Sequence, residues 1–311
     1  MIPATSHPFN GIYAATICPL LDNGDLDETT LARHLEANAF VPGMAGLLIN
    51  GHAGENFTLS REEKRRVTEI AFEVCGQHSI LVSGINAEAS IEAQRHVDDA
   101  KVAGADAVLV FPPFSWALSQ DADMAVTHHS VANANAQMPL MLYQAGVNAG
   151  TMAYQPDVLA RLAQLPNVVG IKEGSWEAAA YEANLRLVKR VAPQVAMMAS
   201  GDEHLLTCFA IGSEGSLVSL ACVVPELIIA LDQAIQDKDL DEARRLNERI
   251  YPLARAIYGT APGGYATARL KTCLKLLGRI PRDTMRLPMG PLPAAEVARL
   301  ENALADAGIT A

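Results

Sequence analysis

Tyr143 and Lys172 are the residues of this chain whose types and positions are best suited to catalysis. Each ends a short apolar run, 139–143 and 168–172, of the kind that forms a strand buried on both faces. Burial of a lysine disfavours its charged ammonium and lowers its pKa, so that the free amine can attack a ketone and form a Schiff base. A phenol nearby could move the protons that this chemistry requires.

A purely structural role is the alternative for both residues. Lys172 could form an ion pair with the adjacent Glu173, and Tyr143 could be a core aromatic whose hydroxyl is hydrogen-bonded. The local pattern by itself leaves both interpretations open.

The segment between the two runs, 156–165, has leucines on one stripe and predicts a helix. A strand, a helix and a second strand predict two parallel neighbours in one sheet. If their alternating side chains face into a barrel, Tyr143 and Lys172 meet at its C-terminal mouth, where catalytic groups of barrels collect.

Strand-like runs recur along the chain with helical segments between them. The first seven begin 27 to 34 residues apart, and an eighth follows, which predicts an α/β fold, a (β/α)8 TIM barrel. A doubly wound open sheet is disfavoured, because no glycine-rich dinucleotide fingerprint follows the first run. The predicted strands are Ile12–Ile17, Ala45–Asn50, Ser79–Ser83, Asp106–Phe111, Pro139–Tyr143, Val168–Lys172, Val195–Ser200 and Ser216–Ser219.

After the eighth run the strand signals stop, and four helical segments follow. We therefore expect the barrel over residues 1–223 and a C-terminal α-helical extension over 224–311. Helix start signals support this division into elements: Ser60 and Glu63 form a capping-box pattern, and Asp27 can cap another helix. The four predicted C-terminal helices are 224–236, 239–258, 264–278 and 292–308.

Composition narrows the class of protein. The chain has 311 residues and a net charge of −11, which argues against nucleic acid or an anionic membrane as a partner. Five cysteines without CxxC spacing predict reduced thiols in a cytoplasmic protein, and residues 1–7 lack the basic region of a signal peptide. Without a spaced set of cysteines and histidines, we expect neither a metal nor another cofactor.

Two further loops carry polar groups at predicted strand ends. The turn 51–55 is bracketed by glycines and could present backbone N–H groups to a carboxylate, while His52 could be an acid–base group or a packing residue. Asp202 and Glu203 could accept hydrogen bonds from substrate hydroxyls, although Asp202 could instead cap the next helix.

These features together resemble the dihydrodipicolinate synthase and N-acetylneuraminate lyase family of class I, pyruvate-handling aldolases, over residues 11–293. The resemblance implies that Lys172 is the Schiff-base lysine and Tyr143 the proton shuttle, with the amides of His52 and Ala53 holding the pyruvate carboxylate. It also implies a homotetramer or homodimer that acts on pyruvate or another 2-oxo acid and an aldehyde. The motifs that carry it are Gly51-His-Ala-Gly-Glu55, Tyr143, Gly170-Ile-Lys-Glu173, Ser200-Gly-Asp202 and Arg286-Leu-Pro-Met-Gly-Pro291.

Departures from the family pattern concern the second substrate. Typical members have two threonines where this chain has His52 and Ala53. Synthases also have a tyrosine at the position of Phe114 and, at the position of Asn148, an arginine that binds the carboxylate of the aldehyde. Loss of a charged bidentate contact weakens binding of an acidic aldehyde, so we expect the chain not to be a true dihydrodipicolinate synthase.

Other residues suggest different second substrates. Asp202 and Glu203, with Ser219, are similar to the hydroxyl-binding set of the sialic-acid lyases and favour a sugar-acid-like 2-oxo acid. Phe114, Trp116 and Trp176 would instead suit an apolar or aromatic aldehyde.

Three functional hypotheses follow. The first is a lyase that catalyses reversible aldol cleavage through an imine on Lys172, and the second is a dehydratase that expels a β-hydroxyl from a deoxy sugar acid through the same imine. The third is a non-catalytic barrel that binds a 2-oxo acid.

Overall fold

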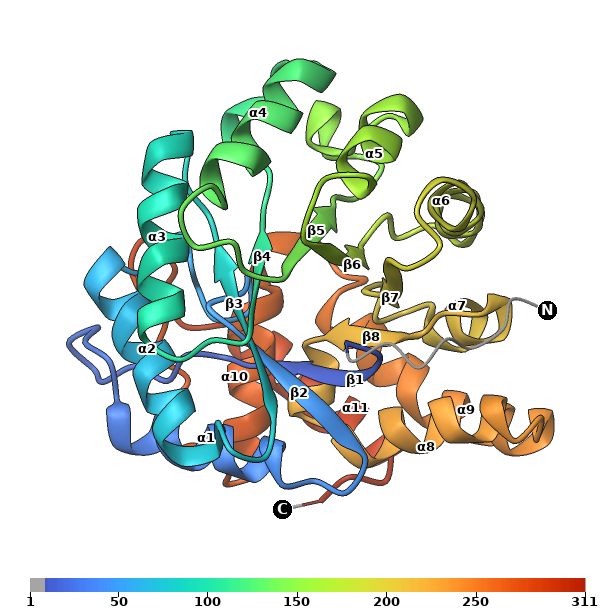
Figure 1. Ribbon diagram of the computed structural model, residues 1–311. Coiled ribbons are helices and arrows are strands. Elements are labelled where there is room, and N and C mark those ends of the chain that lie inside the picture. Colours follow the sequence, from blue (N-terminus) through green and yellow to red (C-terminus); the bar gives the residue numbers. More distant parts are fainter. Residues whose placement is uncertain (1–8, 311) are drawn as a thin grey trace.

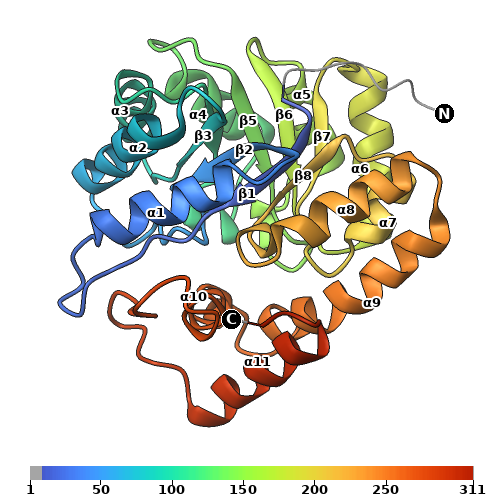
Figure 2. The ribbon, with the colours of Figure 1, turned by 90° about the horizontal axis from the view of Figure 1, so that it is seen from below.

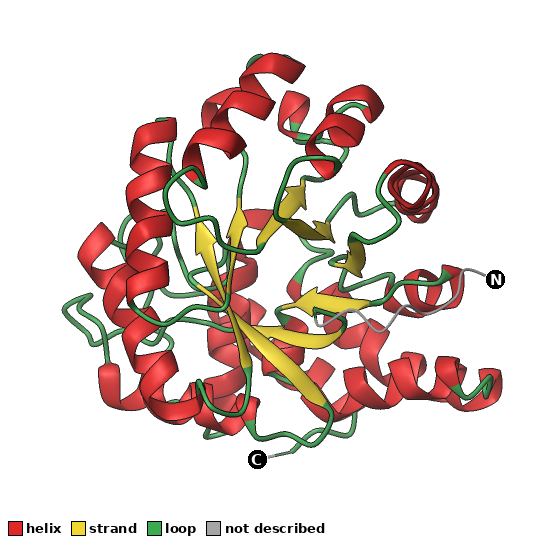
Figure 3. Cartoon of the chain, in the orientation of Figure 1, coloured by secondary structure: helices red, strands yellow, loops and turns green. Residues whose placement is uncertain are grey.

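The computed structural model describes residues 9–310, so the N-terminal segment for which we expect no signal peptide lies outside the described residues. Its eight parallel strands close into a barrel in sequence order, surrounded by helices (Figure 1). Figure 3 shows the alternation of strands and helices around this barrel. The predicted (β/α)8 barrel with a C-terminal helical extension is therefore confirmed.

The strands are β1 Gly11–Ala15, β2 Met44–Ile49, β3 Ile80–Ile85, β4 Ala107–Val110, β5 Leu140–Gln144, β6 Val168–Glu173, β7 Ala196–Ala199 and β8 Gly215–Val218. The helices are α1 Glu28–Ala39, α2 Arg61–Cys75, α3 Ser90–Val102, α4 Ala122–Ala132, α5 Pro156–Ala163, α6 Ala178–Val191, α7 Leu205–Ile211, α8 Pro225–Gln236, α9 Leu240–Ile257, α10 Ala266–Leu276 and α11 Ala294–Asp306. No helix among residues 9–310 is both long and apolar enough to cross a membrane.

The predicted helix caps are present. The Ser60 hydroxyl accepts a hydrogen bond from the Glu63 N–H, and the Glu63 carboxylate accepts one from the Ser60 N–H, which is the reciprocal capping box at the start of α2. At the start of α1, the Asp27 carboxylate accepts from the Thr30 N–H at 3.0 Å. Each cap satisfies backbone donors that the first turn of a helix leaves unpaired.

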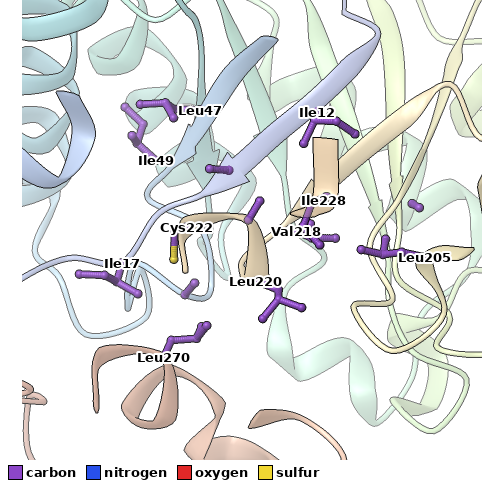
Figure 4. Packing of buried hydrophobic residues seen from close by; sticks show 14 of the residues in the cluster. Ile12, Ile17, Leu47, Ile49, Leu205, Val218, Leu220, Cys222, Ile228 and Leu270 are labelled. Atoms are coloured by element: carbon purple, nitrogen blue, oxygen red, sulfur yellow. The ribbon is translucent and has the colours of Figure 1, made fainter. Parts of the chain in front are cut away.

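Two apolar cores hold the barrel together. Inside it, side chains such as Tyr13, Leu109 and Met198 fill the interior, and Tyr143 packs against them at one end. A larger core lies between the strands and the helices, and Figure 4 shows part of it around Ile12 of β1 and Val218 of β8. The strands are buried on both faces, which explains why they appear in the sequence as continuous apolar runs.

The last helices cover one end of the barrel. In Figure 2, α10 and α11 lie across this end, and α9 links them to α8 beside the barrel. Leu270 of α10 belongs to the same apolar core as the barrel strands (Figure 4). The division of the chain at residue 223 stays a prediction, whereas the position of α10 has a direct consequence for the cavity beneath it.

Candidate active site

A cavity of about 420 Å³ lies at the C-terminal end of the barrel, under α10. Seven of the nine predicted site residues line it, and two do not. The lining residues are His52, Ala53, Phe57, Phe114, Tyr143, Lys172, Trp176, Ser200, Asp202, Ser219, Tyr258, Gly263, Gly264, Ala266, Thr267 and Leu270.

Lys172 and Tyr143 lie side by side on neighbouring strands. They are register partners between β5 and β6, and the Lys172 Nζ is 5.8 Å from the centroid of the Tyr143 ring. Burial lowers the pKa of Lys172 to about 8, although the charge of Asp202 acts in the opposite direction. An appreciable fraction of the amine is therefore uncharged in mildly alkaline solution and can act as a nucleophile.

The alternative ion pair between Lys172 and Glu173 is absent. The Glu173 carboxylate accepts hydrogen bonds from Asn184 Nδ2 at 2.7 Å and from Ser175 Oγ at 3.0 Å. Adjacent side chains on a strand point to opposite faces, so Glu173 faces α6 while Lys172 faces the cavity. Across residues 9–310, no carboxylate lies within ion-pair distance of the Lys172 amine.

Tyr143 is a protonated phenol at neutral pH. Burial, followed by the charges of Glu173 and Asp202, raises its pKa to about 12. The hydroxyl can therefore donate a proton and take it back while it remains neutral in the resting state.

The turn 51–55 brings unpaired backbone donors to the cavity. Within it, Gly54 N–H donates to the Gly51 carbonyl and Glu55 N–H to the His52 carbonyl, both at 3.0 Å. Among the described residues, no acceptor pairs with the N–H groups of His52 and Ala53. Two adjacent free amides that line a cavity are suited to a carboxylate.

His52 is a neutral, stacked imidazole. Its ring lies over Phe111 at 4.2 Å between centroids and meets Tyr143 edge-on at 5.3 Å. Burial, and secondarily the charge of Lys172, lowers its pKa to about 3. Within the described part of the chain its Nε2 is buried and has no hydrogen-bond partner.

A polar wall is formed at the ends of β7 and β8. Asp202 Oδ1 accepts from the Leu220 N–H at 2.8 Å, and the Tyr258 hydroxyl donates to Ser219 Oγ at 2.9 Å. Burial raises the pKa of Asp202 to about 6. The idea that Asp202 caps α7 is wrong, because His204 occupies the N-cap position and no side chain caps that helix.

Several predicted residues lie elsewhere. The Glu203 carboxylate accepts from Arg255 at 2.7 Å outside the cavity, and Asn148 is exposed and does not line it. Phe114 stands at the rim with 43% of its surface exposed. Trp176 lines the cavity, whereas Trp116 is buried and does not.

The residues that form the roof of the cavity carry no local signal in the sequence. Tyr258 follows α9, and Thr267 and Leu270 belong to α10, so all three come from the C-terminal extension. Residues 9–310 contain no group of three or more His, Cys, Asp or Glu side chains arranged to hold a metal ion.

Comparison with known proteins places this barrel in a family. The model of the dihydrodipicolinate synthetase family matches residues 8–307. The 4-hydroxy-tetrahydrodipicolinate synthase of Hyphomonas neptunium is 33% identical over 307 residues, which cover 97% of this chain and 99% of that protein. The enzyme of the same name from Methanothrix thermoacetophila is 31% identical over 299 residues, 95% of this chain and 96% of that one.

Solved structures share the architecture. A dihydrodipicolinate synthase from Acinetobacter baumannii, complexed with pyruvate, has a TM-score of 0.85 at 27% identity and covers 96% of this chain and 99% of that chain. A prophage protein of the same family from E. coli K12 has a TM-score of 0.87 at 22% identity, covering 97% and 99%, and shows the fold alone. The chain therefore belongs to the dihydrodipicolinate synthetase family of class I, Schiff-base-forming lyases.

Proposed function

We propose that Lys172 forms a Schiff base with pyruvate or another 2-oxo acid, and that Tyr143 moves the protons of a reversible aldol cleavage. In the cleavage direction the amine adds to the ketone carbon of a 4-hydroxy-2-oxo acid and water leaves, giving a protonated imine. The C4 hydroxyl then gives up its proton through Tyr143 as the C3–C4 bond breaks, the aldehyde leaves, and the imine takes the electron pair and becomes an enamine. Protonation of the enamine at C3 and hydrolysis of the resulting imine release pyruvate and restore the Lys172 amine. The observation that carries this proposal is the buried Lys172 amine, without an ion-pair partner among the described residues, beside the phenol of Tyr143.

The carboxylate of the 2-oxo acid would bind at the turn 51–55. The free N–H groups of His52 and Ala53 supply two donors, and hydrogen bonds to a charged group contribute about 1.5–3 kcal/mol. The neutral imidazole of His52 beside Tyr143 could replace a threonine hydroxyl as the hydrogen-bonding neighbour of that phenol.

Synthesis of dihydrodipicolinate is not the activity that this cavity favours. That reaction requires an aldehyde that also bears a carboxylate, and Lys172 is the only lysine or arginine among the described lining residues. Asn148 is exposed outside the lining, and Phe114 has no hydroxyl to relay protons. Loss of one charged contact weakens binding roughly tenfold to a hundredfold.

A coupled assay with pyruvate and aspartate semialdehyde tests this part of the proposal. We expect negligible condensation by the purified protein, and we expect that Asn148→Arg alone does not restore it while Phe114 and His52 remain. Ordinary synthase turnover by the unmodified protein would contradict the proposal and would indicate that another cation reaches the cavity.

The polar wall favours a hydroxylated second substrate. The Asp202 carboxylate, the Ser219 and Tyr258 hydroxyls and the face of Trp176 offer the mixture of acceptors, donors and aromatic surface that suits a polyol. Phe57 and Phe114, the aromatic residues at the rim, would instead suit an apolar aldehyde.

A dehydratase of a deoxy sugar acid is the second candidate. Asp202 favours it, because a buried carboxyl with a pKa raised to about 6 is partly protonated near neutrality and could protonate a departing hydroxyl. Incubation with a panel of hydroxylated 2-oxo acids distinguishes the two activities. Pyruvate plus an aldehyde identifies a lyase, whereas a single dioxo or semialdehyde acid identifies a dehydratase, and Lys172→Ala should remove either activity.

We also propose that the chain assembles as a homotetramer or homodimer. The resemblance to the family supports this assembly, and the exposed apolar side chains of Phe57 and Phe114 at the rim could be covered by a second copy. Sedimentation velocity measures the mass directly. One structural neighbour, with a TM-score of 0.86 at 23% identity, is described as a monomeric variant, so a monomer is the contrary result.

A further inference from the structure

A buried ion pair joins the turn 51–55 to the C-terminal extension. The Lys271 amine donates to Glu55 Oε1, and both side chains are almost completely inaccessible to solvent. The second carboxylate oxygen, Oε2, accepts from the Arg286 N–H at 3.1 Å, and the amine also donates to the Thr284 carbonyl at 2.8 Å. Both Glu55 oxygens are therefore bound by residues of the extension.

The turn depends on Glu55 for its shape. The Glu55 N–H donates to the His52 carbonyl, and the Glu55 carbonyl accepts from the Thr58 N–H at 2.8 Å. Its φ of 56° lies in the left-handed region, which a residue other than glycine adopts only when its surroundings hold it there. A displacement of Glu55 would therefore move the amides of His52 and Ala53.

A second contact lies one helical turn earlier on α10. The Thr267 hydroxyl is 3.5 Å from the His52 carbonyl oxygen, and residues four apart share one face of a helix. Leu270, between Thr267 and Lys271 in sequence, lines the cavity. One side of α10 thus contacts the turn at two points and roofs the cavity.

A contribution to folding stability does not by itself explain the buried Glu55–Lys271 ion pair. Desolvation of two charges offsets most of their attraction, and a well-packed apolar replacement is commonly as stable. We propose instead that Glu55 and Lys271 are positioning residues, through which α10 fixes the His52 and Ala53 amides that receive the substrate carboxylate. This inference rests on the proposed function only for the identity of that ligand.

The test combines two readouts on Lys271→Met and on the double variant Glu55→Leu/Lys271→Met. The pyruvate concentration that gives half-maximal borohydride-trapped adduct should rise roughly tenfold to a hundredfold, because poorly placed amides lose charged hydrogen bonds, while the adduct at saturation remains. Hydrogen exchange in the peptide covering 51–56 should accelerate in both variants without pyruvate. The double variant leaves no unpaired buried charge and covers the case in which the single variant fails to fold.

Arg269→Met is the matched control, since Arg269 is a buried cation on the same helix that pairs with Glu296 at 2.8 Å. It should lower the thermal midpoint but leave half-saturation and exchange at 51–56 unchanged. The positioning role would be overturned if Arg269→Met changed half-saturation and exchange as much as Lys271→Met does. It would also be overturned if the folded double variant kept the half-saturating pyruvate concentration and the exchange rate at 51–56 of the unmodified protein. If the unmodified protein forms no adduct, the proposed function fails, and the exchange measurement alone decides the positioning role.

Discussion

The proposed chemistry depends on Lys172, whose amine has no ion-pair partner among the described residues. Glu173 is adjacent in sequence, but strand alternation turns it away from the Lys172 amine, and its carboxylate bonds to Asn184 and Ser175. Asp202, which lines the same cavity, acts on the amine through its charge without forming an ion pair. Burial then lowers the pKa of Lys172 to about 8. The same amine paired with a carboxylate would remain an ammonium and a poor nucleophile.

The rate of imine formation should therefore depend on pH. Because only the uncharged amine attacks the ketone, the rate constant should rise as the pH increases through about 8 and level off above it. Stopped-flow or quenched borohydride trapping between roughly pH 6 and pH 9.5 measures this profile. A profile still climbing steeply at its alkaline end would show an amine with an ordinary pKa.

Tyr143→Phe tests the proton shuttle. The variant keeps the aromatic packing of the barrel interior but loses the hydroxyl, so pyruvate adduct should persist while turnover falls roughly 10²–10⁴-fold. Tyr154→Phe is a suitable control, since Tyr154 is a buried tyrosine that does not line the cavity. Unchanged turnover in Tyr143→Phe would reduce this residue to a packing role.

Strands position Lys172 and Tyr143, and the C-terminal helices close the cavity over them. Tyr143 and Lys172 share a register on β5 and β6, whereas Tyr258 arrives from the end of α9 and bonds to Ser219 after β8. In the proposed function both reactive groups come from the barrel, whereas the C-terminal extension adds Tyr258 to the polar wall.

Tyr258→Phe should affect the second substrate alone. The change removes one neutral hydrogen bond of about 0.5–1.5 kcal/mol, so KM for a hydroxylated substrate should rise roughly two- to tenfold while the pyruvate adduct is unchanged. Tyr251→Phe, on an exposed tyrosine of α9, the helix that Tyr258 follows, should leave KM unaltered. An equal KM in Tyr258→Phe and the unmodified protein would exclude Tyr258 from substrate recognition.

The sequence predicted elements better than it predicted the cavity. Strand ends, caps and the four C-terminal helices depend on local periodicity and on groups such as Ser60 and Glu63, which are close in sequence. The roof formed by Thr267 and Leu270 depends on packing between segments far apart in the chain, for which no local pattern exists. Glu203 does not line the cavity, and its carboxylate instead accepts a hydrogen bond from Arg255, which is far away in sequence on α9.

Burial of Lys172 lowers the folding stability of the whole molecule at neutral pH. Below pH 8 the folded state must hold a buried ammonium, and between pH 8 and pH 10.5 the unfolded chain binds more protons than the folded one. Stability attributable to this group therefore rises with pH across that interval. The cost at neutral pH corresponds to roughly 3 kcal/mol at 1.36 kcal/mol per pKa unit.

Lys172→Met removes the charge while it nearly keeps the side-chain volume. We expect the variant to be inactive yet more stable than the unmodified protein at pH 7, with a difference that shrinks as the pH rises from 8 towards 10.5. Urea unfolding at neutral and at alkaline pH measures both free energies. A variant that is less stable at pH 7 would mean that the lysine contributes to folding through contacts of its own.

The most direct test of the central claim is borohydride reduction in the presence of pyruvate, followed by intact mass measurement and peptide mapping. We predict one stable pyruvate-derived adduct per chain, located on Lys172, and none in Lys172→Ala that remains folded. The absence of an adduct, its location on another lysine, or its persistence in Lys172→Ala would contradict the account.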